Sequence, residues 1–315
     1  MSYVWPQDVF LAMEKGEISA VKALKSLHEM DNMTVPSAKV NQSQKRVEDT
    51  LHELDHLIGL SEVKKIVREI YAFIEIQRRR QRENLNTEPL VLHMIFKGNP
   101  GTGKTTVARI MSKFFCEIGV LTRGHLIEVE RADLVGEYIG HTAQKTREQL
   151  KKAYGGILFI DEAYSLARGG EKDFGKESID VLVKAMEDHK NDLILILAGY
   201  QKEMVSFLET NPGLHSRFPI HIDFPDYSQQ ELLHIAEQMF RARQYSLSTE
   251  TQLALSLLLV SHQSSVCKNF GNARTVRNII EKAIRRQAVR LIAKTSTTRQ
   301  ELMLIEPADL MEVKE

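Results

Sequence analysis

A glycine-rich octapeptide restricts the fold of this chain more than any other stretch of its sequence. Residues 98–105 read GNPGTGKT and match the pattern G-x-x-x-x-G-K-[ST]. The octapeptide follows an apolar run, Leu90 to Phe96, and precedes a segment with apolar residues at helical spacing. That is the context of a phosphate-binding loop. The alternative is a glycine-rich turn with a chance lysine, and pattern and context together argue against it.

Each residue type in this loop suits the binding of a nucleotide. Glycines let successive backbone N–H groups turn inward around an anion, and the N-terminus of the following helix adds partial positive charge. Lys104 is expected to reach the outer phosphates of ATP, and Thr105 to supply a hydroxyl to Mg²⁺. The predicted nucleotide-binding residues of the loop are Gly98, Asn99, Pro100, Gly101, Thr102, Gly103, Lys104 and Thr105.

Two adjacent carboxylates follow another apolar run. In ILFIDE, residues 157–162, Asp161 and Glu162 stand at the carboxyl end of a predicted buried strand, where ligands of open α/β sheets bind. Asp161 is expected to hold Mg²⁺ and Glu162 to polarise the attacking water. The alternative is that the pair merely caps the next helix. A phosphate loop needs a partner for its magnesium, so we favour the catalytic interpretation and expect hydrolysis of the nucleotide.

Apolar runs alternate with helical segments over the middle of the chain. The four runs are Leu90 to Phe96, Leu126 to Val129, Ile157 to Ile160 and Leu193 to Ala198. This alternation predicts an α/β fold with a parallel sheet covered by helices on both faces. After Pro225 helical segments dominate, and the first of them opens with a capping box from Ser228 to Glu231. We therefore predict an α/β nucleotide-binding domain over residues 46–225 and a small all-helical domain over residues 226–315.

Residues 1–45 are predicted to form a leader. Apolar residues between Val9 and Leu27 recur at helical spacing, which predicts one or two short helices that are too small for a core of their own. The stretch from Asp31 to Gln44 is polar, contains Pro36 and shows no period. We expect a linker there, followed by a domain boundary near residue 45.

Composition excludes several classes of protein. Lysine plus arginine and aspartate plus glutamate number 42 each, so no net charge draws the chain to nucleic acid or to an anionic membrane. Its apolar runs are far shorter than the ~20 residues of a membrane helix, and its N-terminus lacks the features of a signal peptide. The two cysteines form no C-x-x-C pair and the histidines are scattered, which argues against a protein metal centre. The expected compartment is a reducing cytoplasm.

Longer strings indicate a family. GNPGTGKT, ILFIDEAYSL and the helical C-terminal segments resemble an AAA+ ATPase. ERADLVGEYIGHTAQKT, GGILFIDEAYSLARGGEKDFGKE, ILILAGY and NPGLHSRFPIHIDFPDYS are similar to the branch that contains stage V sporulation protein K and the red-type Rubisco activases, and most of all to its sporulation member. The resemblance runs from about Leu51 to the C-terminus. It implies a P-loop sheet domain, a helical lid and a homo-oligomeric ring, usually hexameric, that hydrolyses Mg-ATP.

The resemblance assigns roles to residues that the motifs alone leave open. Ile58 and Gly59 resemble the apolar segment that contacts adenine, although a glycine turn ahead of a helix explains them equally well. Arg217 matches the arginine finger that reaches the nucleotide of the neighbouring subunit; without the resemblance it would be a solvated surface arginine. Arg274 matches the lid arginine that senses the γ-phosphate. Arg277 is a close rival for that role, and a plain helix-surface arginine is the alternative.

Two further positions bear on what the ring does. Tyr138, Ile139 and Gly140 resemble the aromatic-hydrophobic-glycine loop that lines the pore and grips a polypeptide. Such a run is more often part of a core, but the flanking glycines and polar residues favour an exposed loop. In contrast, Gly199 and Tyr200 stand where related ATPases commonly have an asparagine or threonine that orients water, so the residue in that role is undetermined.

The leading prediction is an ATPase that remodels a protein client, in sporulation. A Rubisco-activase-like enzyme is the alternative within the same branch. A nucleic-acid motor is the alternative from another class, supported by basic clusters at Arg78–Arg82 and Arg285–Arg290. No aromatic residues interleave with these arginines to stack on bases, which argues against nucleic acid. A nucleotide-gated scaffold would need neither Glu162 nor Arg217.

Overall fold

The computed structural model describes residues 36–87, 90–138, 140–168, 174–209, 212–264 and 271–310. The chain divides into two units, Met1–His52 and Glu53–Glu315. The short helices predicted in the leader lie outside the described residues. The linker predicted over residues 31–44 is wrong for residues 36–44, because helix α3 (Pro36–Asp55) begins there. Pro36 occupies the first helical position, where a missing N–H costs nothing and a fixed φ suits the helix.

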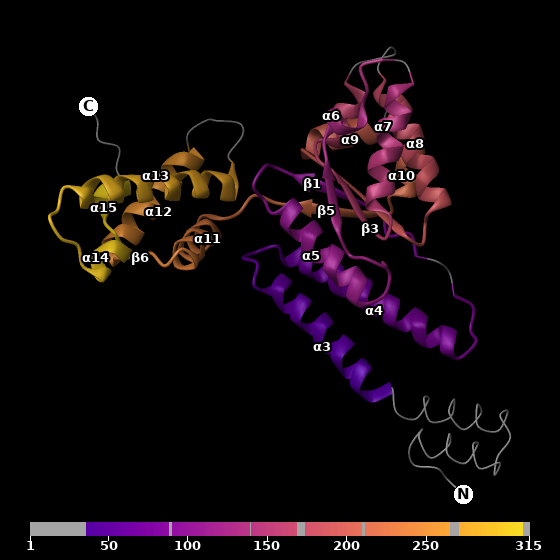
Figure 1. Cartoon of the computed structure of the whole chain (residues 1–315), viewed down its shortest axis with the longest axis horizontal. Coiled ribbons are helices and arrows are strands. Elements are labelled where there is room, and N and C mark those ends of the chain that lie inside the picture. Colours follow the sequence, from indigo (N-terminus) through magenta and orange to yellow (C-terminus); the bar gives the residue numbers. More distant parts are fainter. Residues whose placement is uncertain are drawn as a thin grey trace, which may run out of the picture. The chain divides into compact units, whose positions relative to one another are not determined.

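A five-stranded parallel sheet forms the centre of the second unit (Figure 1). The strand order is β2-β3-β4-β1-β5. Its strands are β1 (Met94–Gly98), β2 (Leu126–Val129), β3 (Gly156–Ile160), β4 (Leu193–Gly199) and β5 (Ile220–Phe224). Every residue of β3 and β4 is buried, which explains their continuous apolar sequence. The predicted parallel α/β sheet is confirmed.

Two details of the sheet differ from the prediction. The first strand begins at Met94, so the apolar run from Leu90 overestimates its length. The sequence analysis also missed β5, an edge strand that pairs with β1. Its sequence IHIDF alternates apolar and polar residues, as expected of a strand that is buried on only one face.

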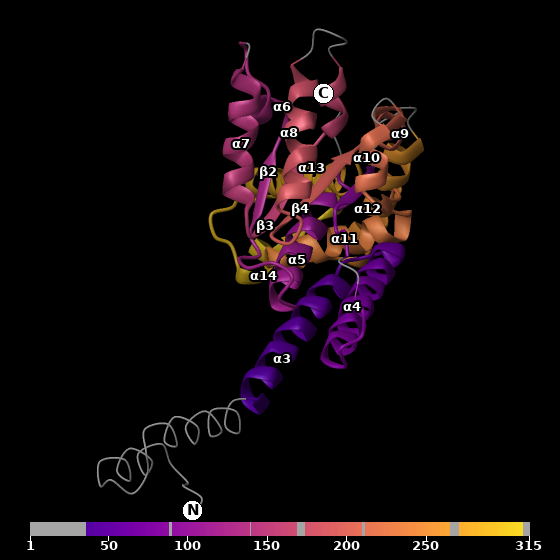
Figure 2. The ribbon, with the colours of Figure 1, turned by 90° about the vertical axis from the view of Figure 1, so that its right-hand side faces the viewer.

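Helices cover both faces of the sheet. Side chains on one face, among them Ile95, Leu158 and Leu195, join the large apolar core of this domain. This core includes residues of α7 (His141–Ala153), α8 (Gly175–Asp188) and α9 (Gln201–Glu209). On the other side, α4 (Ser61–Arg82) contacts β5, and α5 (Lys104–Glu117) contacts β2 and β3. Figure 2 shows α7 and α8 lying side by side.

Short elements connect these layers. They are α6 (Arg131–Leu134), the 3₁₀ helix η1 (Ala163–Ala167) and α10 (Pro212–Arg217). Because all five strands run parallel, the loop after β1, the carboxylates after β3 and the turn after β4 lie at one edge of the sheet.

The C-terminal part is helical, as predicted, apart from one short parallel pair of strands, β6 (Ser246–Leu247) and β7 (Leu304–Ile305). The capping box from Ser228 to Glu231 is confirmed at the start of the first helix. The helices are α11 (Gln229–Ala242), α12 (Thr249–Ser264), α13 (Asn272–Ile292), α14 (Arg299–Met303) and α15 (Pro307–Leu310).

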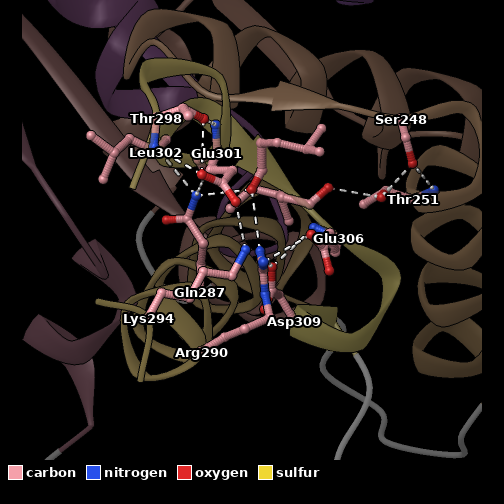
Figure 3. A network of polar contacts seen from close by, with 12 residues as sticks. Ser248, Thr251, Gln287, Arg290, Lys294, Thr298, Glu301, Leu302, Glu306 and Asp309 are labelled. Atoms are coloured by element: carbon pink, nitrogen blue, oxygen red, sulfur yellow. Dashed lines mark hydrogen bonds and ion pairs between the residues drawn. The ribbon is translucent and has the colours of Figure 1, made fainter. Parts of the chain in front are cut away.

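A polar network ties α13 to the end of the described chain (Figure 3). Arg290 bonds Glu306 and the buried Asp309, each at 2.8 Å. The side-chain nitrogen of Gln287 donates to the backbone oxygens of residues 301, 302 and 304. Arg290 therefore serves the packing of this domain, although the sequence analysis counted it in a candidate phosphate-contacting cluster.

Candidate functional site

The phosphate loop has the backbone that its glycines predict. Gly101 and Gly103 have φ of +74° and +98°, a region that L-residues with a side chain rarely adopt. A Cβ at Gly101 would lie 2.8 Å from the backbone nitrogen of Arg274, so glycine is also required there by close packing. The fully buried Thr102 donates to the backbone oxygen of Asn99 at 2.8 Å and closes the loop on itself.

Lys104 is the first residue of α5 and points back over the loop. Its Nζ donates to the backbone oxygens of Gly98 and Asn99 at 2.8 Å each. Burial lowers the pKa of Lys104, and the nearby Asp161 carboxylate opposes this shift. The loop thus places a cation beside backbone N–H groups at a helix N-terminus, an arrangement suited to phosphate.

The predicted site residues gather around one cavity of about 390 Å³. Those that line it are Ile58, Pro100, Gly101, Gly103, Lys104, Thr105, Asp161, Glu162, Arg274 and its rival Arg277. Gly199 and Tyr200, at the position of the missing asparagine, line it as well. Gly98, Asn99, Thr102 and Gly59 are not in its lining; the first three support the loop from behind through the bonds described above. The structure therefore brings together residues separated by more than 200 positions in the sequence.

Asp161 and Glu162 leave β3 in a strained turn. Glu162 has a left-handed φ of 48°, which is uncommon for a residue with a side chain and concentrates at functional sites. Its N–H donates to Oδ1 of Asp161 at 2.9 Å, so the backbone turn also orients the aspartate. Glu162 itself is exposed toward the cavity, where its carboxylate is accessible to water.

The donor set fits magnesium held jointly with a nucleotide. Thr105 and Asp161 offer a hydroxyl and a carboxylate at the same cavity. Among the described residues no cluster of three or more histidine, cysteine or acidic side chains forms a metal cage of its own. Mg²⁺ commonly binds through one or two protein oxygens together with phosphate oxygens and waters, so these two residues suffice.

Tyr164 places a buried hydroxyl beside this turn. Its side chain is 5% exposed, it packs against Tyr200 with ring centroids 5.9 Å apart, and Arg168 lies 4.7 Å from its ring centre. The Glu162 carboxylate is close enough to interact with this hydroxyl, although the two groups do not meet in good hydrogen-bond geometry. Burial and the Glu162 carboxylate raise the pKa of this phenol, so it stays neutral.

The lid residues approach the phosphate loop through a buried junction that the sequence analysis missed. The side chain of Asn272, fully buried at φ 46°, donates to Asp226 at 2.8 Å and accepts from the N–H of Tyr227 at 3.0 Å. The Tyr227 hydroxyl donates to the backbone oxygen of Thr102 at 3.1 Å, and Asn99 donates to Asp226. These partners are far apart in the sequence, and only the Gly271-Asn272 pair ahead of a helix hinted at a special turn.

Apolar residues line the cavity near Ile58. They are Leu57, Leu60, Ile235 and Met239. Gly59 has φ of +65°, which strains any residue with a side chain, and a Cβ there would lie 3.0 Å from Cδ of Glu231, so this position favours glycine. The sequence analysis identified Ile58 and Gly59 but missed Ile235 and Met239, because on α11 they are indistinguishable from ordinary helix core residues.

Arg217 does not line this cavity. It ends α10, and its guanidinium bonds Glu187 of α8, with Nη2 2.5 Å from Oε1. Arg217 is therefore held by groups of α8 and α10 and not by residues of the nucleotide cavity.

Tyr138 is 66% exposed, so it is not a core residue. Its ring meets that of His141 edge-on at 5.5 Å. Gly140 precedes α7 with φ of +82°, and a Cβ there would meet nothing within 4 Å. Ile139, the middle residue of the predicted pore loop, lies outside the described residues. The two described residues of the loop are thus at the surface.

Comparisons with known proteins agree with this arrangement. Residues 94–226 match the model of the ATPase family associated with various cellular activities (AAA), and residues 228–315 match the AAA lid domain. Stage V sporulation protein K of Bacillus subtilis is 58% identical over 259 residues, which cover 82% of this chain and 80% of that protein. The chloroplastic ribulose bisphosphate carboxylase/oxygenase activase of Cyanidioschyzon merolae is 44% identical over 85% of this chain and 92% of that protein.

Among solved structures, the Holliday junction branch migration motor RuvB of Thermotoga maritima superimposes with a TM-score of 0.54. The alignment covers 82% of this chain and 69% of that one at 20% identity, so the likeness concerns the fold. No helix among the described residues is long and apolar enough to span a membrane. Family models and relatives together cover most of the sequence, and the chain therefore belongs to the AAA family of ATPases, with that family's nucleotide-binding and lid domains.

Proposed function

We propose that this protein is a Mg-ATP-hydrolysing ring ATPase, a hexamer, that remodels a protein client through its central pore. The observation that carries the proposal is the cavity in which the phosphate loop, the Asp161-Glu162 pair and two lid arginines meet. A cation for phosphates, two oxygen ligands for magnesium and a carboxylate for water are the groups that phosphoryl transfer to water requires.

Each group in the cavity has a defined task in this proposal. Lys104 and the N–H groups of the loop bind the outer phosphates, while Thr105 and Asp161 hold the magnesium. A bound Mg²⁺ supplies charge that offsets the negative oxygens of the reacting phosphate. Glu162 orients the attacking water and accepts its proton. Arg274 contacts the γ-phosphate from the lid, with Arg277 next to it. Ile58 contacts the adenine, and the backbone turn at Gly59 positions it.

The ring follows from Arg217. Its absence from the lining of its own chain's cavity and its place at the end of a short helix suit a finger that enters the site of the next subunit. The nucleic-acid alternative has less support, because several of the arginines on which it depends have partners within the chain. Arg290 bonds Glu306 and Asp309, Arg78 bonds Glu75, and Arg80 bonds a backbone oxygen.

The client belongs to the sporulation pathway in our proposal, on the strength of the 58% identity to stage V sporulation protein K, and the compartment is the cytoplasm. Rubisco activation is the second candidate, supported by the 44% identity to an activase. Measuring ATP turnover with and without purified inhibited Rubisco separates the two. Stimulation of turnover together with recovery of carboxylation would favour the activase function.

Tyr138→Ala is expected to eliminate client remodelling while basal ATP turnover stays within about threefold of wild type. A phenol that is apolar on its faces and polar at its tip can grip varied side chains, and Tyr138 is absent from the lining of the nucleotide cavity. The measurement is loss of structure in a protein client, detected by fluorescence, beside phosphate release.

Tyr138→Phe is the control for this experiment. It keeps the ring and loses only the hydroxyl, so we expect most of the remodelling activity to remain. Full remodelling by Tyr138→Ala would contradict the pore mechanism. A variant that hydrolyses ATP normally but loses affinity for a single-stranded oligonucleotide would favour the nucleic-acid alternative.

A further inference from the structure

Two groups of its own chain hold the Arg217 guanidinium. Nε and Nη2 donate to Oε1 of Glu187 at 3.2 and 2.5 Å, and Nη1 donates to the backbone oxygen of Gly213 at 2.9 Å. Glu187 belongs to the last turn of α8, whereas Gly213 and Arg217 belong to α10. The side chain is therefore fixed between two helices that pack against each other.

These bonds leave part of the guanidinium available. The group has five N–H donors, of which three are used. One N–H on Nη1 and one on Nη2 find no acceptor among the residues that the structure describes. Two donors on adjacent nitrogens are the arrangement with which arginine binds two oxygens of one phosphate. Arg217 thus retains a donor pair for an anion while its other bonds stay intact.

We infer that Glu187 is a positioning residue for the Arg217 finger. Glu187 holds the guanidinium so that the free N–H groups on Nη1 and Nη2 are available to an anion. The finger is therefore already oriented when it meets the phosphate of the neighbouring subunit. This inference rests on the proposed action of Arg217 across the subunit interface. It is independent of the identity of the client.

The exposure of the Glu187–Arg217 ion pair to water indicates whether Glu187 orients the arginine finger or restrains it. The Glu187 side chain is 61% exposed and that of Arg217 34%, and an ion pair this accessible to water stabilises a fold only weakly. It is therefore too weak to trap the finger. Without this support, the long arginine side chain would have to be ordered in each turnover and would lose rotamer freedom every time. The cost of ordering one such side chain corresponds to about a 2- to 10-fold effect on the rate.

Mixed rings test this inference. An Arg217→Ala subunit keeps its phosphate loop and lacks the finger, whereas a Lys104→Ala subunit keeps the finger and lacks a working loop. Their mixture should hydrolyse ATP although neither does alone. Adding Glu187→Ala to the Lys104→Ala subunit should lower the recovered kcat about 2- to 10-fold. The KM for ATP should not change, because the working site belongs to the other subunit.

Matched variants separate geometry from charge and structure. Glu187→Gln in the same subunit keeps an oxygen acceptor and should preserve recovery within about twofold. Asp180→Ala, at an exposed position of the same helix, should preserve it as well. In rings made only of Arg217→Ala subunits, adding Glu187→Ala should change nothing further, since residues that act through one group are not additive.

The outcomes are distinguishable. Equal recovery with and without Glu187, or greater recovery without it, would overturn the positioning role and leave the finger intact. A further loss when Glu187→Ala is added to Arg217→Ala would also overturn it and assign Glu187 a structural role. No recovery in either mixture, with subunit exchange confirmed, would refute the action of Arg217 across the interface and this inference with it.

Discussion

Arg217→Ala is expected to lower ATP turnover by about 10³- to 10⁵-fold, the range of arginine fingers in other phosphoryl-transfer enzymes. The finger supplies positive charge where negative charge develops in the transition state. The rings of His215 and His221 lie near it and face each other at 5.6 Å. Burial lowers the pKa of His221, so it carries no compensating charge at neutral pH. Phosphate release at saturating ATP is the measurement.

The same variant should still bind ATP and assemble, because Arg217 does not line the cavity of its own subunit. Calorimetry with a non-hydrolysable ATP analogue and sedimentation velocity would check both points. Arg241→Ala is the control, since Arg241 is an exposed arginine of α11. Turnover within tenfold of wild type would show that Arg217 is not the finger.

Glu162→Gln should lower the rate of hydrolysis by about 10²- to 10⁴-fold, the contribution typical of a general base. The substitution keeps the size of the side chain and loses its negative charge, so water is no longer activated. The N–H of residue 162 still donates to Asp161, since this bond involves the backbone. Magnesium and ATP should therefore bind as before, and single-turnover hydrolysis would measure the defect.

A long-lived ATP-bound ring is the second expected property of Glu162→Gln. Such a ring should retain its client, and the polypeptides that co-purify with it would identify the client directly. Glu237→Gln, on the lid helix α11, is the matched control because that glutamate is absent from the lining of the nucleotide cavity. Wild-type turnover in Glu162→Gln would remove Glu162 from the mechanism.

The parts of the site that could be predicted are those in which one short segment carries the chemistry. The loop from Gly98 to Thr105 and the Asp161-Glu162 pair are each continuous in the sequence. The glycines of the loop and the buried strand before the carboxylates predict their geometry. The central strands could be predicted for the same reason, because full burial requires an uninterrupted apolar run.

The parts that were missed depend on contacts between distant residues. Asn272 is an unremarkable helix-start residue in the sequence, and its importance comes from Asp226 and Tyr227, about 45 positions earlier. Glu187 belongs to an ordinary amphipathic helix in the sequence, and its role depends on the contact with Arg217 of α10, which only the fold shows. Strand β5 was not predicted because an edge strand alternates polar with apolar residues and lacks a continuous apolar run. Local propensity contains none of this information.

The junction at Asn272 makes the lid an exchangeable part. Tyr227 and Asn272 reach the phosphate loop through the backbone oxygens of Thr102 and Pro100, whereas Asp226 bonds the side chain of Asn99 in the loop. A lid transplanted from a relative would therefore dock on this loop as long as it brought a phenol and an amide at these two positions and an aspartate ahead of them.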